Sequence, residues 1–528
     1  MSIISDLVKY SRLALSLRTF LNNTISLEQS KQVISERLRN REQNFLTVIQ
    51  RGVYQNPKSP YLKLLRSAGC EFGDIESLVS RDGVEGTLQN LYDNGVYLST
   101  EEYKGRRDIV RGGIRFPLRQ SDLDNPFIPH WYQGQSSGTR SVGTRTTFDL
   151  RHKLEQSYYW LPILEASNAL EVPLAIWKPV LPSMSGISHV LYFWIAGKPV
   201  ARWFSPVDES GVQASVTHRL ALRYLLYGSR LWGARLVKPE FVGLLHADRV
   251  AGWMADTKNE YGGCSLSCSV SSGVKVCQAA LSNNLDIQGT HFFVSGEPLT
   301  EAKRQLIEST GATVTPRYTT SELGRIGCGC TSNTATDDVH LVSDSIAVIQ
   351  HRRKVEHTPV DVNAFLFTTI LPTAPKVLLN FESDDYGVME TRSCDCIFGQ
   401  LGFDRHLHSI RSFDKLTGSG MTVVGSDFVR ILEEVLPRRY GGAPTDYQLL
   451  EEEDSRGQTR LSLIISPAVG EVDERDVINT ILVEMGRNDR IGALSASLWS
   501  QAEALCVKRM NPIPRSGKVV TLELMKKR

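Results

Sequence analysis

The sequence predicts an α/β fold in which a large N-terminal part is followed by a small α+β domain. One observation is that segments of strand length alternate with segments of helix length through the middle of the chain. Strands are expected at 290–295 and 311–318, for example, with a helix at 299–310 between them. This alternation is typical of a sheet whose parallel strands are joined by helices. The other two observations are changes of pattern towards the two ends of the chain.

The N-terminal end has a mainly helical pattern with little alternation of β-branched residues. Ser26-Leu27-Glu28-Gln29 has the form of a capping box, in which a hydroxyl accepts a hydrogen bond from a backbone N–H three residues later. A long helical pattern follows it. We expect residues 1–115 to be a helical lead-in to a large domain that spans residues 1–413.

The pattern changes again towards the C-terminus. Gly418-Ser419-Gly420 predicts a flexible joint, and segments at 447–452 and 461–465 predict a hairpin. Residues 474–487 carry apolar side chains at helical spacing. We therefore expect residues 414–528 to form a small, mobile α+β domain.

Composition indicates a cytoplasmic globular protein. Of the 528 residues, 41% are hydrophobic and 22% are charged, and the formal net charge is +2. This balance gives no argument for nucleic acid or an acidic membrane surface as a partner. The N-terminus lacks the features of a secretory signal, and the longest apolar run is too short to cross a membrane. Nine cysteines without an export signal favour free thiols or a metal site over disulfides.

A run from Gln135 to Thr147 is rich in Ser, Thr, Gly and Arg. Small side chains let the backbone approach an anion closely, and the guanidinium groups of Arg140 and Arg145 match phosphate oxygens. The run is not the P-loop of kinases and GTPases, because Thr144-Arg145 stands where Lys-Ser/Thr is required. Alone, such a run is more often a surface turn, so the assignment depends on other segments.

Five separated segments together resemble motifs of the adenylate-forming ligases, in the phenylacetate–CoA ligase-like branch. The first three resemble the family's phosphate loop, the turn near the adenine and the segment that stacks on the adenine: Ser136-Ser137-Gly138-Thr139, Ser295-Gly296-Glu297-Pro298-Leu299-Thr300 and Tyr318-Thr319-Thr320-Ser321-Glu322. The other two resemble the ribose-binding segment and the C-terminal lysine loop: Thr391-Arg392-Ser393-Cys394-Asp395, with Arg411 before the hinge, and Arg515-Ser516-Gly517-Lys518. The segments occur in the family's order, and the resemblance covers roughly residues 60–528.

The resemblance implies that ATP activates a carboxylic acid to an acyl-adenylate, with release of pyrophosphate, before the acyl group passes to a thiol of CoA or a carrier protein. Lys518 would stabilise the charge between the attacking carboxylate and the α-phosphate, and Glu322 would help to hold Mg²⁺. The phosphate loop, with Arg140 or Arg145, would hold the phosphates, while Asp395 and Arg411 would hold the ribose. The small domain would rotate between the two half-reactions, and a homodimer is expected on the same grounds. The sequence does not identify the acid.

The motifs depart from the family's pattern at several positions. Arg140, Ser141 and Gly143 replace a threonine, a glycine and a proline of the phosphate loop, and Thr319 and Cys394 replace glycines. Two alternative interpretations therefore stay open. One is an acyl-adenylate ligase whose acceptor is an amine or a hydroxyl in a biosynthetic pathway. The other is a degenerate member that binds a nucleotide or an acyl-adenylate without turnover.

The cysteines suggest a zinc site near the proposed Mg²⁺ ligand. Zinc in structural sites takes four sulfur or nitrogen ligands in a tetrahedron. The expected set is the Cys-x-Cys pair, the histidine that follows it and one earlier cysteine: Cys328, Cys330, His340 and either Cys264 or Cys268. Buried free thiols are the alternative. Cys394 and Cys396, which flank Asp395, are expected to be packed thiols.

Overall fold

The computed structural model describes residues 16–128, 132–135, 145–181, 183–208, 216–354, 361–412, 415–418, 421–424, 431–442, 446–453, 459–487, 496, 499–501, 505–515, 518–519 and 522–524. The α-helices of this part are α2 (Leu27–Arg39), α3 (Arg41–Ile49), α4 (Pro60–Ser67), α5 (Phe72–Asp93), α6 (Thr100–Tyr103), α7 (Leu150–Ser157), α8 (Trp160–Ala166), α9 (Ser185–Ile195), α10 (Val216–Arg223), α11 (Ala247–Tyr261), α12 (Val270–Ser282), α13 (Glu301–Glu308), α14 (Ile397–Gln400), α16 (Leu436–Tyr440) and α17 (Glu474–Gly486).

The strands fall into one large sheet, one small sheet and several hairpins. The strands up to β12 are β1 (Ile109–Arg111), β2 (Ile114–Phe116), β3 (Tyr132–Gln135), β4 (Arg145–Phe148), β5 (Leu174–Trp177), β6 (Arg202–Ser205), β7 (Pro239–Phe241), β8 (Ser265–Ser269), β9 (His291–Ser295), β10 (Thr313–Thr320), β11 (Gly324–Cys328) and β12 (Val339–Leu341). The later strands are β13 (Ile346–Lys354), β14 (Asp361–Thr369), β15 (Phe381–Thr391), β16 (Arg405–Ser412), β17 (Lys415–Gly418), β18 (Met421–Val424), β19 (Tyr447–Glu453), β20 (Thr459–Ile465), β21 (Leu505–Arg509), β22 (Pro514–Arg515), β23 (Lys518–Val519) and β24 (Leu522–Leu524).

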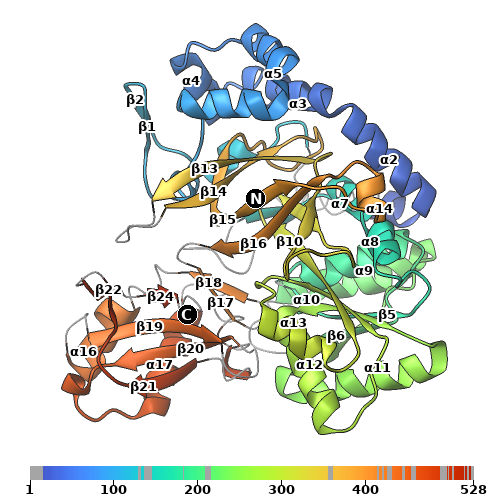
Figure 1. Cartoon of the computed structure of the whole chain (residues 1–528), viewed down its shortest axis with the longest axis vertical. Helices are drawn as coiled ribbons and strands as arrows, with labels where there is room; N and C mark the ends of the chain where they lie inside the picture. The colour runs from blue at the N-terminus through green and yellow to red at the C-terminus, as the bar shows by residue number, and fades with distance from the viewer. Residues whose placement is uncertain are drawn as a thin grey trace.

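The N-terminal end is helical, as predicted, and is drawn in blue in Figure 1. The side chain of Ser26 accepts a hydrogen bond of 3.1 Å from the backbone N–H of Gln29, so the predicted cap of α2 is present. Helix α5 is kinked at Gly83, whose φ of 69° lies in the left-handed region that favours glycine. Apolar side chains of α3, α4 and α5 pack into the main hydrophobic core of the chain.

A twelve-stranded sheet runs through the large part of the described chain in the order β13-β14-β15-β16-β12-β11-β10-β9-β8-β5-β6-β7 (Figure 1). The strands from β10 to β7 pair in parallel. All four residues of β5 are buried, as are the first four of β8 and of β9. Such continuous burial explains why these strands are nearly uniform apolar or small-residue runs in the sequence, since parallel strands are covered on both faces.

The direction of the sheet changes at β10. Strand β11 pairs with β10 in antiparallel orientation, and β12, β16, β15, β14 and β13 continue the antiparallel half. The end of β10 therefore lies where the two halves of the sheet meet. Long antiparallel ladders bring segments that are far apart in the sequence against this end.

The smaller C-terminal part has a sheet and a hydrophobic core of its own. Its four strands have the order β21-β20-β19-β24, and α16 and α17 accompany them (Figure 1, orange to red). The predicted hairpin is present as the antiparallel pair β19–β20, and the predicted helix as α17. The hairpin β17–β18 lies between the two parts. The predicted α/β fold class, with a small α+β unit at the C-terminal end, is confirmed.

No helix in the described part of the chain has both the length and the apolar character needed to cross a bilayer.

Candidate active site

The carboxyl end of β9 forms a tight turn that contains a buried carboxylate oxygen. Gly296 follows the strand with a φ of 86°, a value in the left-handed region. Glu297 accepts a hydrogen bond from the hydroxyl of Ser271 in the first turn of α12, while its other carboxylate oxygen is buried without a partner. Pro298 follows, and Thr300 is the N-terminal cap residue of α13. The turn thus presents a carboxylate with unused hydrogen-bonding capacity at the carboxyl edge of the sheet.

Tyr318 and Asp385 meet at the carboxyl end of β10. The Tyr318 hydroxyl donates a hydrogen bond of 2.6 Å to Asp385, and the hydroxyls of Ser383 and Ser412 donate to the same carboxylate. Burial, and then the charge of Asp385, raise the pKa of Tyr318 well above its ordinary value. Tyr318 therefore keeps its proton, and Asp385 remains an acceptor with several donors arranged around it.

Backbone pairing between β15 and β16 sets the position of Asp385. In this antiparallel ladder Asp385 lies opposite Ser412, and Tyr386 lies opposite Arg411. Asp384 has a φ of 65°, a conformation that is uncommon for residues other than glycine and that Asp tolerates better than most. The Arg411 guanidinium donates a 3.0 Å hydrogen bond to Asp337 and keeps 43% of its side chain exposed. The ladder thus places an arginine beside the residues that hold Asp385.

The end of β10 and the turn to β11 carry Thr319, Thr320, Ser321 and Glu322. The ladder shifts register after Tyr318, and the Thr320 side chain accepts a 3.3 Å hydrogen bond from the Leu323 backbone, which closes the turn. Glu322 is partly buried. Its charge contributes, after burial and the charge of Asp385, to raising the pKa of Tyr318.

Four side chains from three segments form a compact cluster that has the composition of a metal site. The potential ligand atoms of Cys330, His340, Cys394 and Cys396 all lie within 4.8 Å of one another. The Sγ atoms of Cys330 and Cys394 are 3.9 Å apart, and Cys396 Sγ is 3.2 Å from His340 Nε2. Zinc–sulfur bonds of about 2.3 Å in a tetrahedron would place two sulfur atoms roughly 3.8 Å apart. The cluster therefore fits zinc in both ligand type and size.

The surroundings of the cluster orient its histidine and lower the pKa of one of its three thiols. His340 Nδ1 lies 2.7 Å from the carbonyl oxygen of Phe403, to which it donates, and this leaves Nε2 free to face the thiols. Hydrogen bonds from Cys330 and then His340 hold the pKa of Cys396 well below its ordinary value, whereas the hydrogen bond with Cys396, and then burial, raise the pKa of Cys330. A Cβ at Gly399 would lie 1.8 Å from the carbonyl oxygen of Cys394, so only glycine permits this Cys-x-Cys turn.

No family model matches the sequence, and no curated protein matches it. Among solved structures, a 2-hydroxyisobutyryl-CoA ligase, in complex with its acyl-AMP and CoA in the thioesterification state, is similar with a TM-score of 0.52 and 14% identity, over 95% of this chain and 91% of that one. The chain shares the fold of the adenylate-forming ligases.

Two further solved structures, both of synthetases, have lower TM-scores. An amide bond synthetase from Marinactinospora thermotolerans has a TM-score of 0.42 at 10% identity, over 91% of this chain and 92% of that one. An o-succinylbenzoate CoA synthetase from Bacillus subtilis has a TM-score of 0.43 at 10% identity, over 74% and 68%. The assignment of the adenylate-forming fold rests on the 2-hydroxyisobutyryl-CoA ligase.

Several predicted residues of the adenylate-forming site lie outside the described part. They are Ser136, Ser137, Gly138, Thr139 and Arg140 of the loop, together with Ser516 and Gly517. The loop is flanked by the antiparallel pair β3–β4, in which Gln135 lies opposite Arg145. Lys518 lies in β23, opposite Arg515 of β22. The backbone segments on either side of the predicted phosphate loop thus pair with each other, and Lys518 belongs to a short hairpin of the C-terminal part.

Asp395 does not lie where the sequence motif predicts a ribose-binding carboxylate. It is exposed and stands between the two neighbouring cysteines of the metal cluster. Strand β15 runs on from Asp385 to Thr391, a span of about 20 Å at the usual rise per residue, before the chain reaches Asp395. The carboxylate beside Tyr318 is that of Asp385, which the sequence analysis missed. The available signal was the run Ser383-Asp384-Asp385, with an aspartate at the left-handed position.

The predicted zinc ligands are brought together only in part. Cys330 and His340 belong to the cluster, but Cys394 and Cys396, which we expected to be packed thiols, take the other two places. Cys328, Cys264 and Cys268 lie elsewhere: Cys328 contacts the Arg325 guanidinium, and Cys264 the carbonyl oxygen of Met254. Burial raises the pKa of Cys264 and Cys268 to about 12 and that of Cys328 to about 11, which keeps these thiols protonated.

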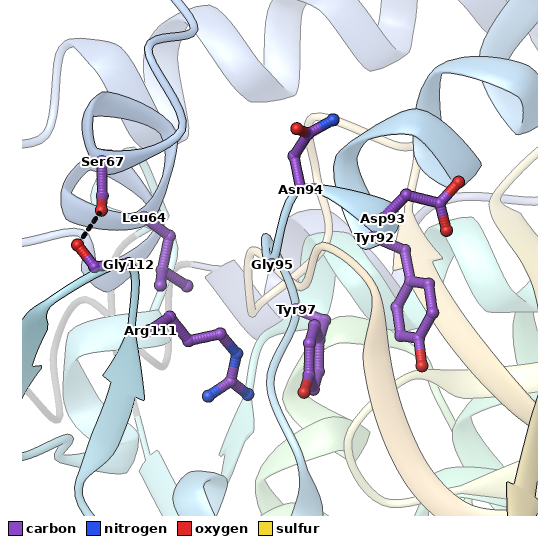
Figure 2. A pocket seen from close by; sticks show the side chains of 9 residues that line it. All are labelled: Leu64, Ser67, Tyr92, Asp93, Asn94, Gly95, Tyr97, Arg111 and Gly112. Carbon is purple, nitrogen blue, oxygen red and sulfur yellow. Dashed lines mark hydrogen bonds between the residues drawn. The ribbon is translucent and has the colours of Figure 1, made fainter.

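A pocket of about 460 Å³ lies in the helical lead-in, remote in sequence from these residues. Figure 2 shows Arg111 and Tyr97 side by side in it, and the guanidinium carbon lies 3.9 Å from the ring centroid. Arg111 also makes hydrogen bonds of 2.7 and 2.8 Å to the two carboxylate oxygens of Glu102. Because this ion pair already neutralises the arginine, the pocket offers no strong charge to a ligand.

Proposed function

We propose that the protein is an ATP-dependent ligase that activates a carboxylic acid as an acyl-adenylate, releases pyrophosphate and passes the acyl group to a thiol of CoA or a carrier protein. The observation that carries this proposal is the carboxylate of Asp385, held by Tyr318 and Ser412 at the carboxyl end of β10 in an adenylate-forming fold. Ligands of α/β sheets bind outside the carboxyl ends of the strands. The similar 2-hydroxyisobutyryl-CoA ligase binds an acyl-AMP and CoA.

The residues divide the chemical work between them. Asp385 accepts hydrogen bonds from the ribose hydroxyls, with Tyr318 fixing its orientation, and Arg411 lies on the neighbouring strand. Glu322, in the turn that follows β10, presents one partly buried carboxylate, which suits Mg²⁺, a cation that takes few protein oxygens together with phosphate oxygens. Mg²⁺, when bound, supplies positive charge that reduces the repulsion between the acid and the phosphates. Lys518 neutralises the charge that develops as the carboxylate attacks the α-phosphate.

The first prediction is that a carboxylic acid stimulates exchange of label between pyrophosphate and ATP. This exchange reports the reversible formation of an acyl-adenylate and needs no acyl acceptor, so it also covers a ligase with an amine or hydroxyl acceptor. Aryl, fatty, hydroxy and dicarboxylic acids should be screened at equal concentration with Mg²⁺. Absence of exchange with every acid, in protein that melts cooperatively, would favour a binding protein without turnover.

The second prediction is that Lys518→Ala lowers the rate of this exchange by about 100- to 1,000-fold, the usual cost of removing one charge-stabilising donor. Lys508→Ala is the matched control, because Lys508 lies in the same small domain, on β21, and pairs with Glu452. The control should exchange at nearly the rate of the unmodified protein. Equal exchange rates in the two variants would show that Lys518 has no catalytic role.

We further propose that Cys330, His340, Cys394 and Cys396 hold a structural zinc ion. The cluster supplies four protein ligands, which completes a tetrahedron and leaves no position for a substrate. It joins the end of β11, the middle of β12 and the turn that follows β15. A metal here would tie together strands on the side of the sheet that also carries Asp385.

A further inference from the structure

Three basic side chains near the proposed nucleotide site form what we call the basic cluster: Arg317 and His189 are in contact, and burial, followed by the charge of Lys178, lowers the pKa of His189 well below its ordinary value. Lys178 directly follows β5, His189 lies on α9, and Arg317 lies on β10 immediately before Tyr318. Lys178 is 8% exposed and Arg317 is 5% exposed. Consecutive side chains of a strand leave it on opposite sides. Arg317 is therefore separate from the contacts that Tyr318 makes with Asp385.

Lys178 lies where the order of the parallel strands reverses. From β5 the sheet proceeds through β6 to β7 in one direction, and from β8 it proceeds through β9 to β10 in the other. Strands β5 and β8 are neighbours, so the reversal lies between them. Such a reversal opens a crevice outside the carboxyl ends of the strands, where ligands of α/β proteins bind. Lys178 occupies this position at the end of β5.

Arg317 is fixed by neutral partners. Its guanidinium donates to Ser267 Oγ at 2.9 Å and to the Phe293 carbonyl oxygen at 3.4 Å, and it lies 4.6 Å from the Trp160 ring centroid. His189 Nε2 is 3.3 Å from the guanidinium, while His189 Nδ1 lies 2.7 Å from the Ser185 carbonyl oxygen. These contacts require a neutral histidine whose Nε2 accepts. The buried Nε of Arg317 has no partner among the described residues.

No carboxylate forms an ion pair with the cluster in the described part of the chain. No ion pair joins Lys178 or Arg317 to an acidic residue there, and Glu297 accepts its hydrogen bond from Ser271. Burial, and then the charge of Arg317, lower the pKa of Lys178 to about 7, while burial lowers that of Arg317 to about 9. Burying charges without a counterion costs several kcal/mol. An arrangement of this kind gains stability when an anion binds.

We propose that the basic cluster binds a second anionic group of the acid substrate, so that the substrates are dicarboxylic acids or acids with an equivalent anionic tail. This rests on the proposed function, in which one carboxylate is activated by ATP at the carboxyl end of β10. Lys178 and the unpartnered Nε–H of Arg317 bind the other anionic end. An uncharged tail would leave both basic groups desolvated and unpaired, which selects against monocarboxylic acids.

The test compares matched substrates in the exchange reaction. Adipate and its monomethyl ester have the same reach but differ in the second charge, and the series from succinate to suberate varies the length. The unmodified protein should prefer the best diacid over its half-ester by about 10- to 100-fold in kcat/KM, the range for hydrogen bonds to charged groups. Lys178→Met should remove most of this preference by lowering kcat/KM for the diacid, with the KM for ATP unchanged. Lys178→Arg should retain it.

Lys178→Met is expected to fold, because it replaces a buried charge by an apolar side chain of similar length. Three results would overturn the proposal. The first is an equal loss of kcat/KM for the diacid and the half-ester in this variant, and the second is a raised KM for ATP. The third is a preference of the unmodified protein for half-esters. Calorimetric titration with adipate separates this proposal from the proposed function, because binding needs no turnover. If no acid supports exchange, adipate binding that Lys178→Met abolishes still supports the basic cluster, and equal binding by both proteins refutes it.

Discussion

Replacing Asp385 by asparagine should lower the rate of acid-dependent ATP–pyrophosphate exchange by about 10- to 100-fold, the usual effect of weakening hydrogen bonds to a charged group. The substitution preserves the size of the side chain but removes its charge and converts one acceptor into a donor. Tyr318, Ser383 and Ser412 all donate hydrogen bonds to this carboxylate. The NH₂ group of an asparagine cannot accept them, so at least one of these hydrogen bonds would be lost. The loss should appear mainly as a higher KM for ATP.

Asp395→Asn is the matched control for this prediction. Asp395 fits the sequence motif for a ribose-binding residue, yet it is exposed and lies between Cys394 and Cys396. The variant should exchange within about twofold of the unmodified protein, since isolated surface substitutions have small effects. Thermal melts of both variants would show whether folding is intact. Full exchange activity in Asp385→Asn, or a large loss of exchange in Asp395→Asn, would instead indicate that Asp395 binds the ribose.

Removing a ligand of the metal cluster should have the largest effect on stability. Purified protein should contain about one equivalent of zinc, and Cys396→Ala should contain almost none. We expect the free energy of unfolding to fall by at least about 3 kcal/mol, since structural zinc contributes on the order of 10 kcal/mol of binding free energy in small domains. Elemental analysis and chemical denaturation of the same preparations measure both quantities.

Cys264→Ala is the control, because Cys264 is a buried thiol that was expected to be a ligand but lies outside the cluster. It should keep its zinc and lose only about 1 kcal/mol of stability from the smaller side chain. A stable protein without metal would refute the zinc site. Loss of zinc in the Cys264 variant would instead favour the ligand set expected from the sequence, in which Cys264 binds the metal.

Much of the fold could be predicted because its signals are local. The strand–helix–strand run expected at 290–318 is present as β9, α13 and β10, and the C-terminal hairpin and helix are present as β19, β20 and α17. Alternation and helical spacing act over a few residues, so they are visible in a single sequence. The order of the motifs along the chain also led to the correct fold.

The site was harder to predict because its residues meet through long-range pairing. Asp385 on β15 meets Tyr318 on β10, although these strands are far apart in the sequence and are not neighbours in the sheet order. The residues around Asp395, by contrast, resemble the family's motif in the sequence alone. The proposed zinc ligands posed the same difficulty, since Cys394 and Cys396 lie far from His340 in the sequence but beside it in the fold. Spacing along the chain does not determine which distant strands are neighbours.

Ser412 has a consequence for communication between the two parts of the protein. It is the last residue of β16, and the chain continues from it towards β17 and the small domain. Its hydroxyl is anchored on Asp385, the carboxylate that we propose for the ribose. A nucleotide whose ribose hydroxyls bind Asp385 would compete with the hydrogen bond from Ser412, the residue at which the chain leaves for the small domain. Nucleotide occupancy and the orientation of the small domain would then be thermodynamically linked, each changing the other by the same coupling free energy.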